Sequence, residues 1–421
     1  MAILRPDRRR FIHGTAGALA SFTGLVAPRR ATASLKGSAS GPPLPRSKLI
    51  RGLEFTGPAF KYPGTGTDMH WWTWAADGDL YVVDDDGRNF GNPWNFAHLL
   101  RVTGAPPTHK IEEVSRFPGL GRPSTGKVRY VSGALAVDNR LYVAAYDYDY
   151  SFPGNERWRV TDKQGNDPIR NDAATMLLDA VSSHAGVAGI MYSDDSGKTW
   201  NNVPDGKTPY FLGPNFGGLA FVGFGPGYTG LPESLGSYVY ALSNDENWET
   251  GNNIFMARVL RNRILDRSAW EFYAGVAGEP AWTNEEFRAR PILSDPGKVG
   301  HPSMTWNAGL GCFLLAYFSD VVPHSLATMP DVAAKTWHRA RQLTIVEGPT
   351  PWGPWALVHH EQKWEGAHVA YLPQIPSKWL SADGLQGTLL FSGDYSQFTK
   401  PPAPKDSYYA FMTRPFRFIT R

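Results

Sequence analysis

Two aspartates, Asp68 and Asp86, are the residues of this chain best placed for acid–base chemistry. Residues 76–78 (Ala-Asp-Gly) have the composition of a three-residue hairpin turn with glycine in the left-handed position. In the register that this turn sets, Asp68 lies directly opposite Asp86, and directly opposite residues share one face of a sheet. Asp84 would share that face, and Asp85 would point away.

Such a pair of carboxyl groups suits the hydrolysis of a glycosidic bond. Because neighbouring carboxylates do not both ionise easily, one stays protonated as an acid while the other acts as a base. In an inverting hydrolase the two carboxyl groups lie about 6.5–9.5 Å apart, which leaves room for a water. The sequence leaves open which of Asp68 and Asp86 is the acid. It also leaves open that residues 84–86 form a solvated turn or a cation site.

Substrate-binding roles are predicted for residues that could flank this pair. His70 and Trp72 should share the face of Asp68 by the two-residue period of a strand, although His70 could equally be a structural histidine. Arg258 could clamp an anionic group or form an ion pair at a sheet edge. Further candidates are His301, Glu365 and His368, which could line the site together with nearby aromatic residues.

Two other classes of function stay open. A polysaccharide lyase would use a set of His, Tyr and Arg side chains, for which His98, Arg129 and Tyr130 are candidates beside His70. A non-catalytic carbohydrate-binding protein would keep the aromatic residues and lack paired acids. No metal or cofactor is predicted, because His359-His360 lacks spaced partners. The one exception is a structural Ca²⁺, for which Asp147 or Asp149 could supply oxygen ligands.

A recurring unit of the chain must position these residues. Each unit has a tight turn, a short apolar and aromatic strand, and a polar end; the strands are Leu80–Val83, Leu141–Val143, Tyr238–Leu242, Phe313–Leu315 and Leu389–Phe391. Units of roughly 75 residues are long enough for four-stranded blades. We therefore predict an all-β fold, a single five-bladed β-propeller over residues 49–421.

Residues 193–200 match the pattern Ser-x-Asp-x-Gly-x-Thr-Trp and resemble the Asp-box of sialidases and related β-propellers. In such a hairpin the Asp caps backbone N–H groups, the Gly takes a positive φ and the Trp packs beneath the turn. Because this hairpin could belong to a blade of its own, a six-bladed propeller also stays open. A short helix is expected at residues 173–183, on an insertion spanning residues 150–186.

The first 33 residues are predicted to be an export signal. Residues 8–12 (Arg-Arg-Arg-Phe-Ile) resemble a twin-arginine signal, and a small-x-small cleavage site follows at residues 31–33. The apolar run between them is too short for a spanning helix. Residues 34–48 are typical of a flexible leader. We therefore expect a secreted or periplasmic bacterial protein, exported by the twin-arginine machinery, without a membrane span in the mature chain.

Net charge and cysteine content narrow the range of possible partners and reactive residues. The formal net charge is +3, and the first 33 residues contribute six Arg and one Asp. Removing those five net positive charges leaves the mature chain near −2, which argues against a nucleic-acid partner. The only cysteine, Cys312, lies in an apolar run and is expected to be a core residue.

Residues 67–81 and 86–87 resemble the opening hairpin of a group of secreted, sialidase-like bacterial propellers that long carried only a domain-of-unknown-function label. That group includes endo-D-arabinanases acting on mycobacterial cell-wall arabinan. Further short motifs share the resemblance, at residues 213–217, 256–259, 306–311, 351–355 and 373–384. The resemblance implies that Asp68 and Asp86 are the acid and base and that the substrate is a polysaccharide such as an arabinan. Two departures, the Asp84-Asp85-Asp86 run and His70, leave the sugar open.

Overall fold

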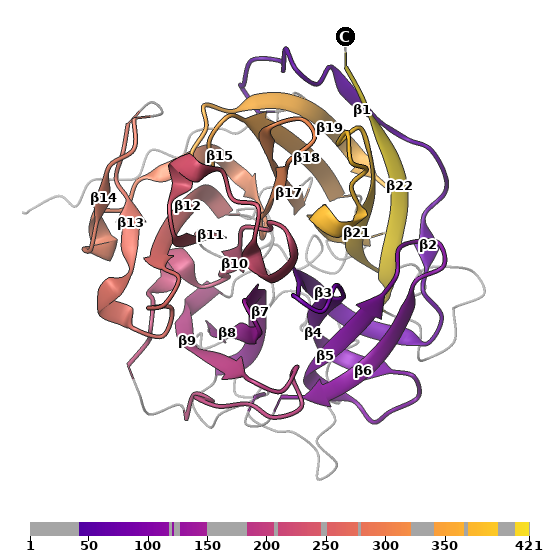
Figure 1. Ribbon diagram of the computed structural model, residues 1–421, viewed down its shortest axis with the longest axis vertical. Helices are drawn as coiled ribbons and strands as arrows, with labels where there is room; N and C mark the ends of the chain where they lie inside the picture. The colour runs from indigo at the N-terminus through magenta and orange to yellow at the C-terminus, as the bar shows by residue number, and fades with distance from the viewer. Residues whose placement is uncertain are drawn as a thin grey trace, which may run out of the picture. The chain divides into compact units, whose positions relative to one another are not determined.

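Five antiparallel sheets radiate around one axis in the computed structural model (Figure 1). The structure describes residues 42–117, 120–121, 127–149, 183–205, 209–245, 251–276, 279–320, 341–365, 369–394 and 409–420. The sheets follow one another in chain order, and we call them blades 1 to 5. The fold is therefore the predicted five-bladed β-propeller.

The blades are built from the following strands. Blade 1 contains β3 (Thr65–Trp74), β4 (Leu80–Asn89), β5 (Asn95–Thr103) and β6 (Lys110–Arg116); blade 2 contains β7 (Lys127–Val137), β8 (Arg140–Asp149) and β9 (Ser183–Ser193). Blade 3 contains β10 (Ala220–Phe221), β11 (Tyr238–Asn244), β12 (Gly251–Leu260), β13 (Glu271–Tyr273) and β14 (Trp282–Thr283), and β15 (Pro291–Val299) pairs with β12. Blade 4 contains β16 (Ser303–Asn307), β17 (Cys312–Asp320), β18 (Arg341–Gly348) and β19 (Ala356–Trp364).

Blade 5 joins the two ends of the described chain. Its strands are β20 (Val369–Gln374), β21 (Gln386–Asp394), β22 (Phe411–Ile419) and, as the outermost strand, β1 (Gly52–Phe55) from the beginning of the fold. The short β2 (Phe60–Lys61) also pairs with β22. Single-turn 3₁₀ helices occur in the connections, at Pro214–Phe216, Pro226–Tyr228, Glu233–Leu235, Arg267–Ala269, Glu286–Arg288 and Ser377–Trp379. None of the helices among the described residues is long and apolar enough to cross a membrane.

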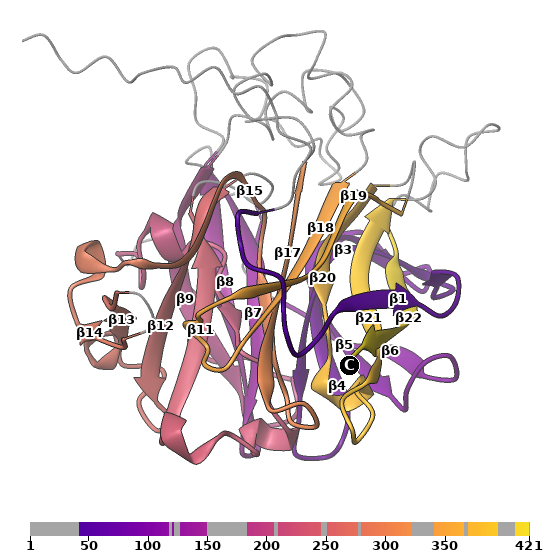
Figure 2. The ribbon, with the colours of Figure 1, turned by 90° about the horizontal axis from the view of Figure 1, so that it is seen from above.

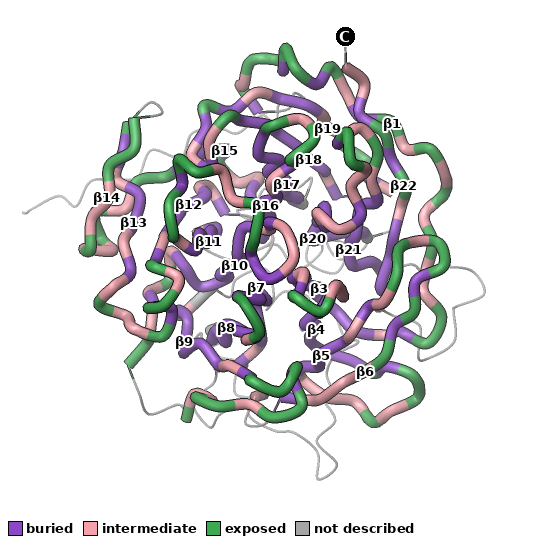
Figure 3. The backbone as a smooth tube through the Cα atoms, in the orientation of Figure 1, coloured by how far each residue is buried: buried purple, intermediate pink, exposed green. Residues whose placement is uncertain are grey.

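The five repeated units of the sequence are the second strands of the five blades. They fall in β4, β8, β11, β17 and β21, one in each sheet. Each second strand is covered on both faces by neighbouring strands or blades, which explains its run of apolar residues. Figure 3 shows this burial concentrated in the strands and exposure concentrated in the connections. The innermost strands, β3, β7, β10, β16 and β20, line the axis (Figure 3). Figure 2 shows β3, β7 and β20 from the side.

The hairpin at residues 193–200 belongs to blade 2, because Tyr192 at the end of β9 bridges to Asn201. Asp195 accepts hydrogen bonds from the Thr199 N–H at 2.9 Å and from the Thr199 hydroxyl at 2.7 Å. Gly197 has a φ of 87°, and the Trp200 ring lies 4.5 Å from that of Phe117. The hairpin thus has the expected turn geometry, and it does not add a sixth blade.

Part of the expected leader packs on blade 4. Ser47 Oγ donates a hydrogen bond of 2.8 Å to Glu347, and Arg46 forms a β-bridge with Leu357. Residues 42–48 are therefore attached to the propeller, which was not expected from their composition. The predicted signal at residues 1–33 lies outside the described residues, and so does the helix predicted at residues 173–183, except for Ser183, which begins β9.

Candidate active site

Two compensating bulges interrupt the first hairpin of blade 1. Near the turn the register is the predicted one, with Trp74 opposite Leu80 and Trp71 opposite Val83. The pairing then shifts, so that Asp68 lies opposite Asp85 rather than Asp86, and the original register returns further along at Gly66. Each strand therefore has one extra residue in this stretch, and the predicted pairing of Asp68 with Asp86 is wrong by one position.

Backbone conformation marks both bulges. Met69 on β3 has a φ of 52°, while Asp86 and Gly87 on β4 have φ values of 30° and 149°. A side chain at Gly87 would place its Cβ 2.1 Å from the carbonyl oxygen of Gly66, so the β4 bulge needs glycine there. Left-handed conformations are costly for residues other than glycine and are characteristic of functional sites.

The bulges bring three carboxyl groups to the same side of blade 1, towards blade 2 and the axis. Asp68 and Asp85 share a face because they are directly opposite. Asp86 accepts a hydrogen bond of 3.3 Å from the Tyr130 hydroxyl of β7. The exposed fractions of Asp68, Asp85 and Asp86 are only 8%, 4% and 7%. The expectation that Asp85 points away is thus overturned, since the bulges break the simple alternation.

Tyrosine hydroxyls from neighbouring blades meet these acids. Tyr371 of β20 donates a short hydrogen bond to Asp68 Oδ1, which also accepts from the Met69 N–H at 2.9 Å. Burial, reinforced by the negative charge of Asp85, raises the pKa of Tyr146 well above its usual value. Tyr146 therefore stays a neutral hydroxyl at any working pH.

The inner strands of three blades are irregular beside this site. The register of β20 shifts just after Tyr371, where Leu372 has a φ of 51°, and the register of β7 shifts between Ser132 and Ala134. With the bulges of blade 1, these irregularities direct side chains from blades 1, 2 and 5 to the axis. Bulges of this kind re-aim side chains next to active sites.

His301 packs beside Tyr146, the tyrosine whose pKa Asp85 and Asp68 help to raise, and its role in substrate binding stays a prediction. Its ring lies 5.2 Å from that of Trp71 and 5.9 Å from that of Tyr146, and the side chain is fully buried. A Cβ on Gly218 would lie 2.6 Å from the imidazole, so the glycine makes room for this histidine. We call the group Asp68, Asp85, Asp86, Tyr130, Tyr146, His301 and Tyr371 the axial site.

His70 and Trp72 face away from the axial site, contrary to prediction. The face of Asp68 continues through Asp85 and Val83 to Trp71, so His70 and Trp72 lie on the opposite face, towards blade 5. His70 is fully buried, with Nδ1 2.8 Å from Ser392 Oγ, and burial lowers its pKa to about 4. Trp72 packs in the apolar core between blades 1 and 5. The physical reason is the β3 bulge, which separates Asp68 from His70 and breaks the two-residue period.

Arg258 and Glu365 are held by partners outside the axial site. Arg258 pairs with Glu271 at 2.8 Å, and its guanidinium lies 4.1 Å from each of the Tyr238 and Trp282 ring centres, all within blade 3. Glu365 pairs at 2.5 Å with Arg414 of β22. Neither side chain is brought to the three acids, and His368 lies outside the described residues.

The remaining candidates divide between the site and its surroundings. Tyr130 belongs to the axial site, whereas Arg129 makes a two-pronged ion pair with Asp147 at 2.6 and 2.9 Å. That pairing uses both carboxylate oxygens of Asp147, one of the two residues suggested as Ca²⁺ ligands, and the structural Ca²⁺ stays a prediction. Within the described ranges, no three His, Cys, Asp or Glu side chains converge as a metal site would require. Cys312 is buried, and its burial raises the pKa of the thiol to about 12, as expected for a core residue.

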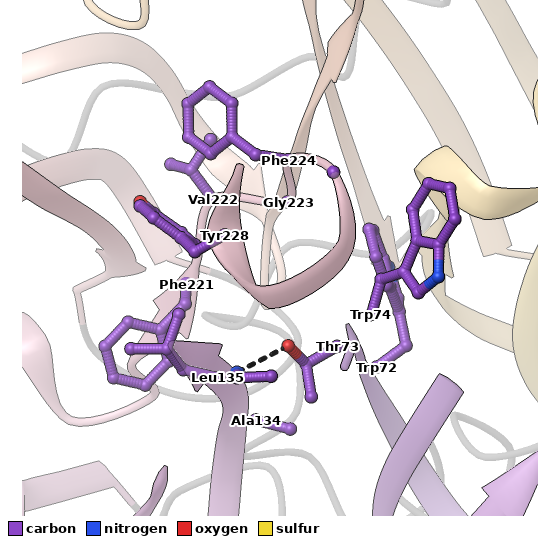
Figure 4. Close-up of a pocket in the computed structure, with 12 residues that line it drawn as sticks. Trp72, Thr73, Trp74, Ala134, Leu135, Phe221, Val222, Gly223, Phe224 and Tyr228 are labelled. Carbon is purple, nitrogen blue, oxygen red and sulfur yellow. Dashed lines mark hydrogen bonds between the residues drawn. The ribbon is translucent and has the colours of Figure 1, made fainter. Parts of the chain in front are cut away.

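A small pocket lies further along the inner strands β3 and β7 (Figure 4). It is lined by Trp72, Thr73, Trp74, Ala134, Leu135, Ala136, Phe221, Val222, Gly223, Phe224, Gly225 and Tyr228. Thr73 accepts a hydrogen bond of 2.7 Å from the Ala136 N–H, which ties the two strands together. No carboxyl group lines this pocket, so it offers no acid–base pair.

Sequence reasoning missed Asp85, Tyr146 and Tyr371. Asp85 was hidden by the bulges, which no local residue pattern announces. Tyr146 lies in the polar end of the second repeated unit, in the run Tyr146-Asp147-Tyr148-Asp149. The polar ends of the repeated units were therefore the signal that could have located it.

A model of the family described as "Domain of unknown function (DUF4185)" matches residues 177–378, a little under half of the chain. This match agrees with the domain-of-unknown-function part of the resemblance seen in the sequence. No curated protein matches the chain.

Several solved structures are similar in fold to this chain. One is a protein from Bacteroides ovatus ATCC 8483, provisionally described as a hydrolase, with 14% identity, 85% of this chain and 87% of that chain covered, and a TM-score of 0.45. Another is a GH43_1 enzyme from Xanthomonas citri, with 11% identity, coverages of 85% and 90%, and a TM-score of 0.41. A third is an α-L-arabinofuranosidase from Podospora anserina, in complex with cellotriose, with 10% identity, coverages of 89% and 98%, and a TM-score of 0.43.

Proposed function

We propose that this protein is a glycoside hydrolase that cleaves a polysaccharide outside the cytoplasm by an inverting mechanism. The observation that carries the proposal is the axial site, where three nearly buried carboxyl groups, Asp68, Asp85 and Asp86, meet tyrosine hydroxyls from two other blades. Carboxyl groups are seldom buried, and clusters of buried ionisable groups are typical of functional sites.

The hydrogen bonds suggest how the acids divide the work. Asp68 accepts from the Met69 N–H and from the Tyr371 hydroxyl, an arrangement that favours the ionised form and suits a base. Asp86 is then the acid. A water attacks the anomeric carbon and gives its proton to Asp68, while the glycosidic bond breaks and the leaving oxygen takes the proton of Asp86.

Asp85 supplies a second negative charge to the same reaction, because Asp86 as the acid is protonated. It lies directly opposite Asp68, so a sugar ring that reacts beside Asp68 would develop its oxocarbenium-like positive charge near Asp85. A fixed charge in a site shielded from water stabilises such a transition state more strongly than it would in water. Asp85 therefore contributes electrostatically, without taking or giving a proton.

Polysaccharide lyase activity is the second candidate, because His301 and Tyr146 lie together at the same site with ring centres 5.9 Å apart. A lyase removes a proton next to a uronate carboxyl group and leaves an unsaturated sugar. The arginine that would neutralise the uronate is less available, since Arg129 is bound to Asp147. Hydrolysis is therefore the better supported reaction.

The test is product analysis on a panel of cell-wall and algal polysaccharides, including arabinans. We expect new reducing ends without ultraviolet absorption, with inverted anomeric configuration by NMR. The Asp68→Asn and Asp86→Asn variants should each lose about 10²–10⁴-fold in rate. Asp138→Asn, at an exposed turn between β7 and β8, is the matched control and should keep full activity. Ultraviolet-absorbing products would identify a lyase, and binding without any product would identify a non-catalytic protein.

The location outside the cytoplasm rests on the signal-like residues 1–33. Fractionation of cells producing the full chain, with and without Arg8→Lys and Arg9→Lys, tests this point. We expect export of the unchanged chain and retention of the double variant. Equal export of both would show that the twin-arginine route is not used.

A further inference from the structure

We infer that Asp84 is a positioning residue that holds both bulges of blade 1, and with them the catalytic carboxyl groups, in place. This inference rests on the function proposed for Asp68 and Asp86. Asp84 belongs to the same acidic run as Asp85 and Asp86, but it faces blade 5 instead of the axis. It is fully buried, and its hydrogen-bond partners lie outside the axial site.

Asp84 collects donors from both strands of the hairpin and from the next strand. Its Oδ1 accepts from His98 Nδ1 of β5 at 2.8 Å. Its Oδ2 accepts from the Thr67 hydroxyl of β3 at 2.7 Å and from Asn89 Nδ2 of β4 at 3.2 Å. All three donors are fully buried. Three donors satisfy a buried carboxylate that would otherwise be costly to bury.

The positions of these partners connect the network to the site. Thr67 immediately precedes Asp68, and Asn89 lies just beyond the bulge at Asp86 and Gly87. Asp84 itself lies on the other side of that bulge. Its side chain therefore bridges the β4 bulge and ties it to the start of the β3 bulge, where the backbone is left-handed at Met69.

His70, which follows Met69 in the β3 bulge, also contacts this network. Its Nε2 lies 4.0 Å from Asp84 Oδ2 and 3.4 Å from Thr67 Oγ1, while its N–H donates to Ser392 Oγ at 3.1 Å. Gln374 of β20 donates to the His70 carbonyl oxygen. The same network thus fixes blade 1 against blade 5, from which Tyr371 reaches Asp68.

The consequence is a division of labour within one acidic run. Asp85 and Asp86 face the axis, and Asp84 holds the backbone that presents them. A displacement of about 1 Å in a reacting group can cost roughly a hundredfold in rate. Loss of the Asp84 network should therefore reduce kcat with little change in KM.

The experiment compares kcat, KM and hydrogen exchange for three variants of the full chain. Asp84→Asn keeps the size of the side chain but turns an acceptor into a donor facing other donors. Thr67→Val removes one donor, and Thr67→Ser retains it. We expect about a 10- to 100-fold fall in kcat for Asp84→Asn and Thr67→Val, unchanged KM, and near wild-type rates for Thr67→Ser.

Asp295→Asn is the matched control, because Asp295 is also a buried aspartate and accepts a hydrogen bond of 3.2 Å from Tyr317, away from blade 1. It should lower the melting temperature while leaving kcat unchanged. Amide exchange should become faster in residues 65–74 and 80–89 of Asp84→Asn, and should stay unchanged in residues 312–320.

The two proposals fail in different ways. A wild-type protein without hydrolytic activity would refute the proposed function, and the exchange measurement alone would then decide whether Asp84 holds the bulges. An active wild type whose Asp84→Asn variant keeps its kcat would overturn the positioning role and leave the function intact. Equal kcat losses in Asp84→Asn and Asp295→Asn would also overturn it, since general destabilisation would then explain both.

Discussion

The hydrogen bond from Tyr371 to Asp68 makes a quantitative prediction about pH. Tyr371→Phe removes only a hydroxyl, and the fully buried ring keeps its place beside Phe318, 6.1 Å away. Of these two donors, Asp68 would then keep the Met69 N–H. A hydrogen bond to a charged group contributes about 1.5–3 kcal/mol. Its loss destabilises the ionised form of the base relative to the protonated form.

The direction of the change in the pH–rate profile follows from the role of Asp68 as the base. A base must be ionised to act, and losing a donor to the ionised form raises the pH at which ionisation occurs. At about 1.4 kcal/mol for each tenfold change, the acid limb of the kcat/KM profile should move up by roughly 1 to 2 in pH. Below that limb the rate should fall by about 10- to 150-fold, and at higher pH it should recover.

The assay is a pH–rate profile for the wild type, Tyr371→Phe and a control, Tyr240→Phe. Tyr240 is also buried, and its hydroxyl donates to the Leu235 carbonyl oxygen at 2.9 Å. This hydrogen bond belongs to blade 3 and involves none of the three acids. The control should be less stable but have an unmoved profile. An acid limb of Tyr371→Phe that coincides with the wild type would refute Asp68 as the base held by this hydroxyl.

Three further predictions concern stability and the bulges. Burial lowers the pKa of His109 to about 4, so between pH 6.5 and 4 the unfolded chain binds a proton that the folded chain does not. The melting temperature measured by calorimetry should therefore be highest above pH 6.5 and fall towards pH 4. This fall should be shallower in His109→Leu. Gly87→Ala would force a Cβ against the Gly66 carbonyl, and should lower both the melting temperature and kcat, whereas an alanine tolerated without loss would argue against a tight β4 bulge. Hydrogen bonds from Thr199 lower the pKa of Asp195 to about 2, so Asp195→Asn should reduce the melting temperature at neutral pH while kcat, measured in parallel, stays at the wild-type value.

The sequence predicted the architecture because the repeated unit is a local pattern. Each second strand needs apolar residues on both faces, and that requirement appears in the composition of five short segments. The turn at residues 76–78 likewise determined the register next to it, and pairs from Trp74–Leu80 to Trp71–Val83 are as predicted. Local chemistry therefore accounts for the blades and for the beginning of the hairpin.

The axial site could not be predicted in the same way. The two bulges of blade 1 cancel, so the register at Gly66 and Arg88 is the one that a regular hairpin would have. The register at both ends of the hairpin is therefore regular, and it gives no sign of the one-residue shift at Asp68. Long-range partners were equally hidden, since Tyr371 lies 303 residues from Asp68.

Two charged residues predicted to bind substrate, Arg258 and Glu365, lie outside the axial site for a related reason. In a sequence, an arginine or glutamate in a strand looks available for a ligand. Arg258 is instead enclosed by two aromatic rings and Glu271, and Glu365 by Arg414, which lies 49 residues further along. Only the packing of neighbouring strands shows that these charges are already neutralised.

The pairing of β1 with β22 means that the ring cannot close before β22 has been synthesised. Gly52 pairs with Ile419, so the edge of blade 5 stays open until residues 411–419 have left the ribosome. Contacts of such high sequence separation slow folding and leave strand edges exposed to aggregation in the meantime. A deletion of residues 52–55 should therefore leave a protein that associates edge to edge, whereas extensions added before residue 42 would leave the last pairing intact.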